Sequence, residues 1–397
     1  MDKKKRAFIL LLIIYFFIIF GTEIFYRKKL YAISVEFEQN IKQSGFWHGF
    51  FFFWSYIFIY GMMFIATIIV VLYYPYNVMA CYIANELSLI IIMCFLKSIY
   101  ANSRPYWDIY NERYINNDFT SFPTECDGGF GNPSGHSLMS TSFLSLWYLF
   151  INSKYLRQLQ RKWRNCLSIF SFFLVIICIA SVTFSRIHRQ IHSFNQIILG
   201  TLIGIGIFFL FCFIIEFDKI KPNEFVNFLN KFKFVLLPLF FIFFGISVTL
   251  GFLIHNEKER NYEKVLDHFC KYRKEQIFGI NTAYHSGLIF ILIGGYIGIL
   301  FLRYNINKSQ YNKEGLFYHW NQGPRLRTLK IALFSFLLPV IPLVSIFIIP
   351  YKYFYLKFIF EILLYAWYGF AALGLCFYYG VLLFTKEKNI IVSINIY

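Results

Sequence analysis

Apolar residues in this chain occur in runs of about 20, the length of helix that crosses the hydrocarbon core of a bilayer. Of the 397 residues, 58% are hydrophobic and only 15% are charged, a balance that excludes an ordinary soluble domain. The runs predict an all-α polytopic membrane protein with about ten transmembrane helices. The predicted spans are 7–26, 47–73, 78–97, 137–152, 166–184, 195–216, 234–254, 277–302, 330–350 and 357–385. We expect the short span 137–152 to depend on its neighbours.

Positive charge is concentrated in loops between these spans. A net charge of +17 would suggest a nucleic-acid partner in a soluble protein, but here the basic segments 153–165 and 303–330 are typical of cytosolic loops. We therefore expect no nucleic-acid partner. The segment 98–136 is acid-rich, so the alternation predicts both termini in the cytosol and this segment on the opposite side. The basic stretch 27–29 disagrees with this topology, which makes the first span the least secure.

Two processing questions concern the first span and the cysteines. A basic stretch, residues 3–6, precedes the first span as in a signal peptide, but no small-x-small cleavage site follows it, which favours an uncleaved anchor. The eight cysteines have no metal-site spacing, so no metal site is predicted. Cys126 and Cys270 both fall in predicted outside loops. They could pair in an oxidising compartment, although nothing in the sequence indicates that they meet.

No repeat, low-complexity tract or Gly/Pro-rich linker divides the chain, which favours one membrane domain. Within it we expect three regions. Residues 1–77 hold spans one and two, residues 78–217 form a catalytic core of spans three to six, and residues 218–397 form a four-span extension. All the chemical motifs lie in or beside the middle region.

The first motif, Lys97 followed by Arg104-Pro105, supplies two cations at the end of the third span. Seven positions are about two helical turns, which would put both charged groups on one side of the segment. The guanidinium of Arg104 can pair with two phosphate oxygens, whereas the Lys97 ammonium is a point charge. An ordinary basic pair at the membrane interface would have the same pattern.

The second motif, Pro133-Ser134-Gly135-His136, directly precedes the fourth span. It predicts a turn leading into a helix N-terminus, whose free N–H groups and dipole attract an anion. Ser134 adds a hydroxyl donor, and an imidazolium at His136 is suited to protonate a leaving alkoxide. A plain helix N-cap with a histidine at the interface is the alternative interpretation.

The third motif is Ser185-Arg186 followed by His192 and Gln196. One helical turn separates the last two, so their side chains can touch. A nucleophilic histidine must be neutral and needs an acceptor for the hydrogen on its other nitrogen, which the Gln196 amide oxygen could provide. Arg186 would be a third phosphate cation. A polar interhelical loop is the alternative, and we expect His188 and Arg189 to lie on the loop surface.

These three motifs resemble the type 2 phosphatidic acid phosphatase superfamily, whose pattern is Lys-x6-Arg-Pro, Pro-Ser-Gly-His and Ser-Arg-x5-His-x3-Asp. Every position fits except the last, where Gln196 replaces the aspartate as in the glucose-6-phosphatase branch. The flanks Arg104-Pro105-Tyr106-Trp107 and 122–131 also look like that branch. The resemblance is strong between residues 95 and 205. That branch has one span fewer than predicted here, and the extra span lies at the front.

The resemblance implies a six-helix phosphatase core, a mechanism and a location. His192 would attack phosphorus and become phosphohistidine, His136 would protonate the leaving group, and Gln196 would orient His192. No metal or other cofactor is implied. The protein would reside in the endoplasmic reticulum membrane with the active site on the lumenal side. The residues that would bind the phosphate are Lys97, Arg104, Ser134, Gly135 and Arg186.

The leading hypothesis is a membrane phosphomonoesterase whose partners are the lipid bilayer and a small-molecule phosphate ester, a soluble sugar phosphate. One alternative is a lipid phosphate phosphatase acting on phosphatidate or sphingosine phosphate. Another is a transporter or scaffold that binds phosphorylated ligands, although a binder needs the cations and not the histidine pair. A vanadate-dependent peroxidase would share the anion pocket, but those relatives are soluble or peripheral. The sequence leaves the substrate and the oligomeric state open.

Overall fold

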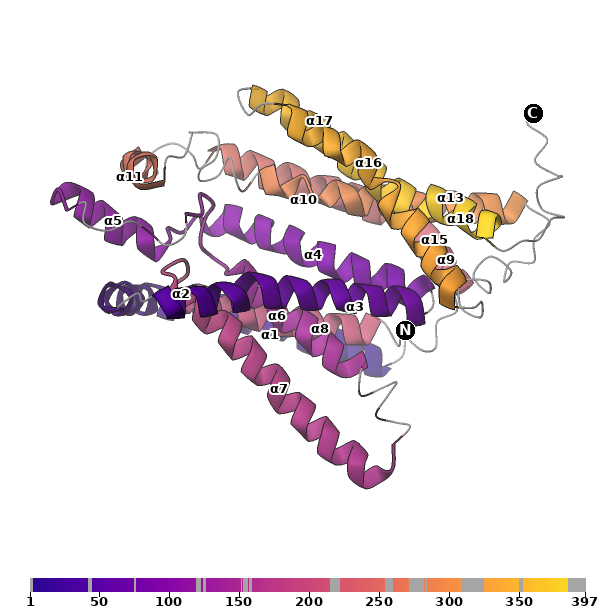
Figure 1. Ribbon diagram of the computed structural model, residues 1–397, viewed down its shortest axis with the longest axis horizontal. Coiled ribbons are helices and arrows are strands. Elements are labelled where there is room, and N and C mark those ends of the chain that lie inside the picture. The colour runs from indigo at the N-terminus through magenta and orange to yellow at the C-terminus, as the bar shows by residue number, and fades with distance from the viewer. Residues whose placement is uncertain are drawn as a thin grey trace. The chain divides into compact units, whose positions relative to one another are not determined.

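The computed structural model describes residues 3–41, 45–74, 76–118, 123, 126–150, 152, 156, 159–214, 222–253, 260–270, 282, 284–308, 325–349 and 353–384. Every regular element within these ranges is a helix, which confirms the predicted all-α class (Figure 1). In the same ranges nine helices are long and apolar enough to cross a membrane. This confirms a polytopic membrane protein.

The nine candidate spans match nine of the predicted runs. They are Arg6–Asn40, Gly49–Tyr73, Val78–Tyr100, Arg161–His188, Phe194–Cys212, Lys233–Gly251, Tyr284–Asn305, Arg325–Ile348 and Phe354–Phe384. The remaining run, predicted at 137–152, is α6 (Gly135–Phe150), a 16-residue helix. At 1.5 Å per residue it is about 24 Å long, shorter than the hydrocarbon core. It packs against α7 (Arg161–His188) and α8 (Phe194–Ile214), as expected for a short span that depends on its neighbours.

The chain forms two compact units, and all three motifs lie in the first. That unit comprises Met1–Phe64, Ile92–Ile214 and Ile246–His285. The second unit comprises Ile65–Ile91, Ile215–Gly245 and Ser286–Tyr397.

In the second unit, α13 (Ile289–Lys308) packs against α17 (Phe354–Phe370) and the π-helix η8 (Ala371–Leu375), which leads into α18 (Cys376–Phe384). Glycine allows this approach, because a Cβ added to Gly294 would lie 1.9 Å from the Ala366 carbonyl oxygen. Close backbone contact of this kind is typical of helices that associate in membranes. The unit also contains α9 (Pro222–Lys231), α15 (Arg325–Leu337), α16 (Val340–Leu343) and the first part of α10 (Lys233–Leu253).

Helix α1 (Lys3–Asn40) of the first unit is longer than predicted. The predicted apolar span ends at residue 26, but the helix continues to Asn40 because its polar C-terminal part packs against α5 (Pro105–Ile115) and α8. Arg27, which conflicted with the predicted topology, pairs with Glu23 on the same helix, with Nε 2.7 Å from Oε1. One of the misplaced positive charges is therefore compensated within α1.

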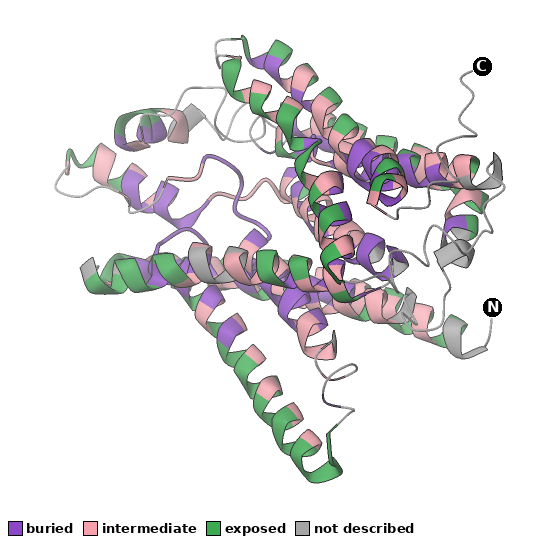
Figure 2. Cartoon of the chain, turned by 45° about the vertical axis from the view of Figure 1, so that its right-hand side comes forward, coloured by how far each residue is buried: buried purple, intermediate pink, exposed green. Residues whose placement is uncertain are grey.

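Further helices belong wholly or in part to the first unit, which includes the chain up to Phe64 and again from Ile92. Helix α2 (Gly45–Phe52) continues through the π-helical η1 (Phe53–Phe58) into α3 (Ile59–Tyr73), and α4 (Tyr76–Tyr100) leads to the first motif. Large apolar side chains such as Phe170, Phe173 and Ile177 are exposed on α7 (Figure 2). A continuous apolar surface on one helix is what contact with lipid requires.

Helix α11 (Arg260–Cys270) packs on α5. The mixed charge signs of 255–276 are typical of a solvated surface helix, and α11 exposes Lys264, Asp267 and His268. Its other face is buried through Val265, Leu266 and Phe269. Their spacing places them on one face of the helix, which packs against Tyr106 and Trp107 of α5. This pair of helices, α5 and α11, is joined to the second motif's loop by a disulfide between Cys126 and Cys270.

Candidate functional site

Arg104 is fully buried at the start of α5 and connects separate parts of the chain. Its Nε donates to the Gly129 carbonyl at 2.5 Å, and its Nη2 lies 2.8 Å from Oδ2 of Asp127. Its Nη1 lies 3.4 Å from Nε2 of His192. The guanidinium thus connects the first motif with the loop before the second motif and with the third motif.

The chain between Lys97 and Arg104 departs from the predicted continuous helix. Helix α4 ends at Tyr100, and Ala101 adopts a left-handed conformation with φ 43°. Arg104 is extended, with φ −95° and ψ 149°, as expected for a residue before proline. The two cations are therefore not brought together by two turns of one helix, because the helix ends between them.

His192 and Gln196 form the contact that their spacing predicts. Both are buried, and His192 Nδ1 lies 3.1 Å from Gln196 Oε1. The Gln196 amide is oriented by its Nε2, which donates to the Ser103 carbonyl at 2.8 Å. Oε1 is then the acceptor that faces the imidazole, which assigns the hydrogen to Nδ1 and leaves the lone pair on Nε2. That nitrogen faces Arg104.

The surroundings of His192 also favour the neutral imidazole. Burial lowers its pKa well below the usual value, and the charges of Arg104, Arg186 and Lys97 lower it further. The hydrogen bond that His192 donates to Gln196 opposes this shift. A neutral ring with an unprotonated nitrogen beside a cation is the state that a nucleophilic histidine needs.

Glycine permits the loop before the second motif to pass over Gln196. A Cβ added to Gly131 would lie 2.6 Å from the amide nitrogen and oxygen of the Gln196 side chain. Its N–H donates to the Asn102 carbonyl at 2.9 Å, which fixes the loop to the segment before Arg104. Any larger residue here would displace the amide that orients His192.

The second motif forms the predicted turn and helix start. The Asn132–Pro133 peptide bond is cis, and Gly135 is the first residue of α6. Ser134 is fully buried; its N–H donates to the Gln196 carbonyl at 3.0 Å, and its Oγ accepts from Ser137 Oγ at 3.0 Å. The turn is therefore attached directly to the third motif.

Tyr56 of η1 brings His136 and Arg186 to one aromatic ring. The His136 ring meets it edge to face at 5.3 Å between centroids, and the guanidinium carbon of Arg186 lies 5.6 Å from its centroid. Ser55, the preceding residue, lies 2.5 Å from Ser185 between the hydroxyl oxygens. Sequence reasoning missed Tyr56, because an aromatic residue within the apolar run 47–73 carries no distinguishing signal.

His188 and Arg189 were predicted to lie on the loop surface, and the structure corrects this. They are only 7% and 4% exposed. The His188 ring packs on Phe51 at 4.5 Å between centroids, and the Arg189 guanidinium carbon lies 5.1 Å from the Tyr56 centroid. The aromatic side chains of α2 and η1 cover this end of α7, which a reading of single segments could not anticipate.

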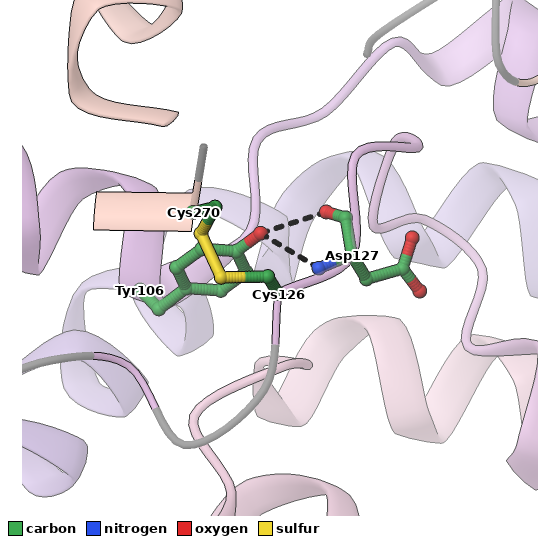
Figure 3. The surroundings of a disulfide bond; sticks show 4 residues. All are labelled: Tyr106, Cys126, Asp127 and Cys270. Atoms are coloured by element: carbon green, nitrogen blue, oxygen red, sulfur yellow. Dashed lines mark hydrogen bonds between the residues drawn. A yellow bond between two sulfur atoms is a disulfide. The ribbon is translucent and has the colours of Figure 1, made fainter. Parts of the chain in front are cut away.

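Asp127 is the counter-ion of Arg104. Figure 3 shows Asp127 beside Tyr106 and the Cys126–Cys270 disulfide. Its backbone is fixed by Tyr106, whose hydroxyl donates to the Asp127 carbonyl at 2.7 Å and accepts from the Asp127 N–H at 3.0 Å. The adjacent Cys126 forms the disulfide with Cys270. Burial raises the pKa of the Asp127 carboxyl, but Arg104, Lys97 and Arg186 lower it more, so the pKa lies well below its usual range.

The charges of all three predicted cations therefore reach both Asp127 and His192. Within the ranges that the structure describes, no group of three or more His, Cys, Asp and Glu side chains could hold a metal ion. The arrangement offers a neutral imidazole, a second histidine, a helix N-terminus and three cations. It can hold a tetrahedral anion beside an attacking nitrogen.

Comparison with known proteins gives the same assignment for this region. The PAP2 superfamily matches residues 71–221. The chain is 30% identical over 123 residues to glucose-6-phosphatase 2 of Mus musculus, a match covering 27% of this chain and 32% of that protein. It is 27% identical over 119 residues to glucose-6-phosphatase catalytic subunit 1 of Bos taurus, covering 28% and 32%. No solved structure matches the chain.

A third relative, glucose-6-phosphatase catalytic subunit 1 of Felis catus, is 25% identical over 164 residues, which is 40% of this chain. The matched segment spans 42% of that relative's own length and about a third of the other two. The similarity thus covers less than half of the length of each of these relatives. It confirms the predicted resemblance to the superfamily.

Proposed function

We propose that the protein is a membrane-bound phosphomonoesterase that resembles glucose-6-phosphatase, since residues 71–221 match the PAP2 superfamily. In this proposal it hydrolyses a sugar phosphate through a phosphohistidine intermediate. The observation that carries the proposal is the placement of His192, with Nδ1 against Gln196 Oε1 and Nε2 against Arg104.

In the first step, His192 Nε2 attacks phosphorus and the bond to the ester oxygen breaks. His136, as the imidazolium, gives its proton to the departing alkoxide, so that the sugar leaves as an alcohol. Burial and the charge of Arg186 lower the pKa of His136, so in this proposal the bound phosphate dianion stabilises that proton. In the second step, water attacks the phosphohistidine while His136 takes a proton from it. Inorganic phosphate leaves, and both histidines return to their starting states.

The phosphoryl oxygens carry the developing charge, and fixed donors around them supply most of the acceleration. We assign this role to Lys97, Arg104, Arg186, the Ser134 hydroxyl and the Gly135 backbone. Asp127 pairs with Arg104 when no phosphate is present, so it keeps the buried guanidinium in position. The guanidinium has five N–H donors, and these contact Gly129, Phe130, Ile191, His192 and Asp127, so in this proposal phosphate takes the place of one of these partners.

Two observations favour a sugar phosphate over a lipid phosphate. The residue that orients His192 is a neutral glutamine, which adds no negative charge near a dianionic monoester. The three relatives that match part of the chain are named glucose-6-phosphatases. The disulfide beside Asp127 supports a location with the site on an oxidising side of the membrane, such as the lumen of the endoplasmic reticulum.

The test is phosphate release by purified protein with glucose 6-phosphate, phosphatidate and sphingosine phosphate measured side by side. We expect the highest kcat/KM for glucose 6-phosphate, and we expect His192→Ala to abolish both turnover and trapping of a phosphoenzyme. Faster hydrolysis of either lipid would replace the sugar-phosphate proposal with the lipid one. No phosphoenzyme in the wild-type protein would exclude the covalent mechanism.

A further inference from the structure

Helix α1 lies outside the matched residues 71–221, yet it carries a row of polar residues along one face. They are spaced by three or four positions, which is the repeat of a single helix face. Three of them are completely buried, although they belong to none of the motifs. We call this row the polar face of α1; its members are Glu23, Arg27, Tyr31, Ser34 and Glu38.

The first contact of the polar face is with the second motif. Glu23 Oε1 accepts a hydrogen bond from Asn132 Nδ2 at 3.1 Å. Asn132 directly precedes the Pro-Ser-Gly-His turn, and the same Nδ2 donates to Asn102 Oδ1 at 3.0 Å. Because Arg27 is bonded to the Glu23 carboxylate, the acceptor is held in place from the other side.

The second contact is with the first motif. The Tyr31 hydroxyl lies 2.9 Å from Ser103 Oγ and donates to Asp108 of α5. Ser103 directly precedes Arg104, and its carbonyl accepts from the Gln196 amide. Tyr31 is therefore bonded to the residue that anchors the glutamine against His192.

The third contact is with the segment that carries His192. Ser34 Oγ accepts from the Phe194 N–H at 2.7 Å, which satisfies an amide in the first turn of α8 that has no partner within its own helix. The Glu38 carbonyl accepts from Gln190 Nε2 at 2.7 Å. Gln190 is left-handed, with φ 61°, a conformation that needs support from its surroundings. His192 lies between these two fixed points.

We propose that the polar face of α1 is a positioning element of the phosphate site, which holds the three motif segments in register through Glu23, Tyr31 and Ser34. This inference rests on the proposed function, because one of its tests measures kcat with a phosphate monoester. A helix that served only as an anchor would gain nothing from buried polar groups, because burying them costs free energy unless they are bonded. Here each of the three bonds reaches a residue within two positions of a motif.

The experiment uses two substitutions in the full chain that remove only a hydroxyl, Ser34→Ala and Tyr31→Phe. The matched control is Thr22→Val, which removes a hydroxyl from an exposed position of the same helix, where it bonds only to its own backbone. Measurements are kcat and KM with p-nitrophenyl phosphate, the thermal midpoint, and the dissociation constants of orthovanadate and inorganic phosphate.

We expect kcat to fall about tenfold to 100-fold in both variants, because small displacements of reacting groups have effects of this size. KM should change less than about threefold, and binding of vanadate, which mimics the transition state, should weaken more than binding of phosphate. Ser34→Thr, which keeps the hydroxyl, should restore kcat, and Thr22→Val should behave as wild type.

Unchanged kcat and vanadate affinity in variants with a lowered thermal midpoint would overturn the proposal and leave α1 a structural anchor. Equal weakening of vanadate and phosphate would also contradict it. Vanadate binding separates this inference from the proposed function. If the wild-type protein binds vanadate and hydrolyses no monoester, the proposed function fails, while the affinities of the variants still decide the role of α1.

Discussion

Two neighbouring side chains determine the tautomer and the orientation of the His192 imidazole. Gln196 fixes the hydrogen on Nδ1, and Arg104 faces Nε2. A carboxylate in place of Gln196 would make the ring more basic, but it would also put a negative charge beside the incoming phosphate. The neutral amide keeps the orientation and avoids that repulsion. A site of this kind relies on the cations more than on the basicity of the nucleophile.

In the proposed mechanism His136 is the proton donor, so the effect of replacing it should depend on the leaving group of the substrate. His136→Ala should slow hydrolysis of glucose 6-phosphate by about 100-fold or more, since general-acid catalysis has this magnitude. The loss with p-nitrophenyl phosphate should be less than about tenfold, because that leaving group needs little protonation. The measurement is kcat for both substrates. Ser134→Ala is the control, since loss of a hydroxyl that donates to a phosphoryl oxygen should slow hydrolysis of both substrates alike. Equal losses in His136→Ala would remove it from this role.

Asp127 should make stability depend on pH. Its folded pKa is depressed, so it contributes stability above the unfolded value of about 3.9, and this contribution is lost as the pH falls through the folded value. Asp127→Asn should therefore lower the thermal midpoint by a few degrees at pH 7, because it leaves the Arg104 charge unpaired. The difference in thermal midpoint between Asp127→Asn and the wild type should become smaller below about pH 4. Asp267→Asn, at an exposed site on α11, should show no difference. A difference at Asp127 that is constant with pH would contradict the prediction.

At this scale, short-range contacts could be predicted and long-range ones could not. The His192–Gln196 bond follows from one helical turn, and the extended Arg104 follows from the proline after it. The contact of Tyr56 with His136 joins residues that are 80 positions apart in the sequence. No pattern within either segment encodes such a pair.

Among the helices, apolar runs predicted the spans well and the polar surfaces poorly. A helix needs about 20 apolar residues to cross the bilayer, so the length of an apolar run indicates a span. Nine of the runs match candidate spans among the described residues. The C-terminal part of α1 breaks that pattern because polar residues on one of its faces pack against α5 and α8. The buried face of α11 was missed for a related reason, since its charges dominate the composition of a segment whose apolar residues share one face.

The disulfide between α11 and the loop of Asp127 gives a prediction at the scale of elements. It joins residues 144 positions apart, and closing a loop of that length stabilises a fold by roughly 4–5 kcal/mol in the chain-entropy account. Cys126→Ser and Cys270→Ser should each lower the thermal midpoint. They should also lower turnover, because Asp127 and Tyr106 lose their fixed position. Dithiothreitol should affect wild type in the same direction.

Cys166→Ser is the control for the disulfide, since Cys166 is exposed and free. It should leave midpoint and turnover unchanged. If Cys126→Ser behaves like Cys166→Ser, the bond does not hold the site. If only one of the two disulfide variants loses activity, the effect belongs to that residue and not to the bond.

For the whole molecule, the disulfide and the charge pattern lead to the same topology by independent arguments. Basic loops favour the cytosol, and the segment 303–330 is among the most basic. A disulfide persists on an oxidising side, and Cys126 lies in the loop that leads to the second motif. The charge pattern predicts the motifs and the segment 303–330 on opposite sides of the membrane, and in our proposal the disulfide puts the motifs on the oxidising side.

The chain's glycosylation sequon tests this topology. Asn307-Lys308-Ser309 is its only such sequence, and it falls in the predicted cytosolic loop. Expressed in a secretory-pathway host, the wild-type protein should carry no glycan, so treatment with an N-glycosidase should not change its mobility. Asp118→Ser creates a sequon at Asn116, an exposed residue at the end of α5, and this variant should be glycosylated because α5 lies on the side of the motifs. A glycan on Asn307 together with none on Asn116 would invert the topology. The phosphate site would then face the cytosol, where Cys126 and Cys270 would be reduced, and the lumenal location would have to be abandoned.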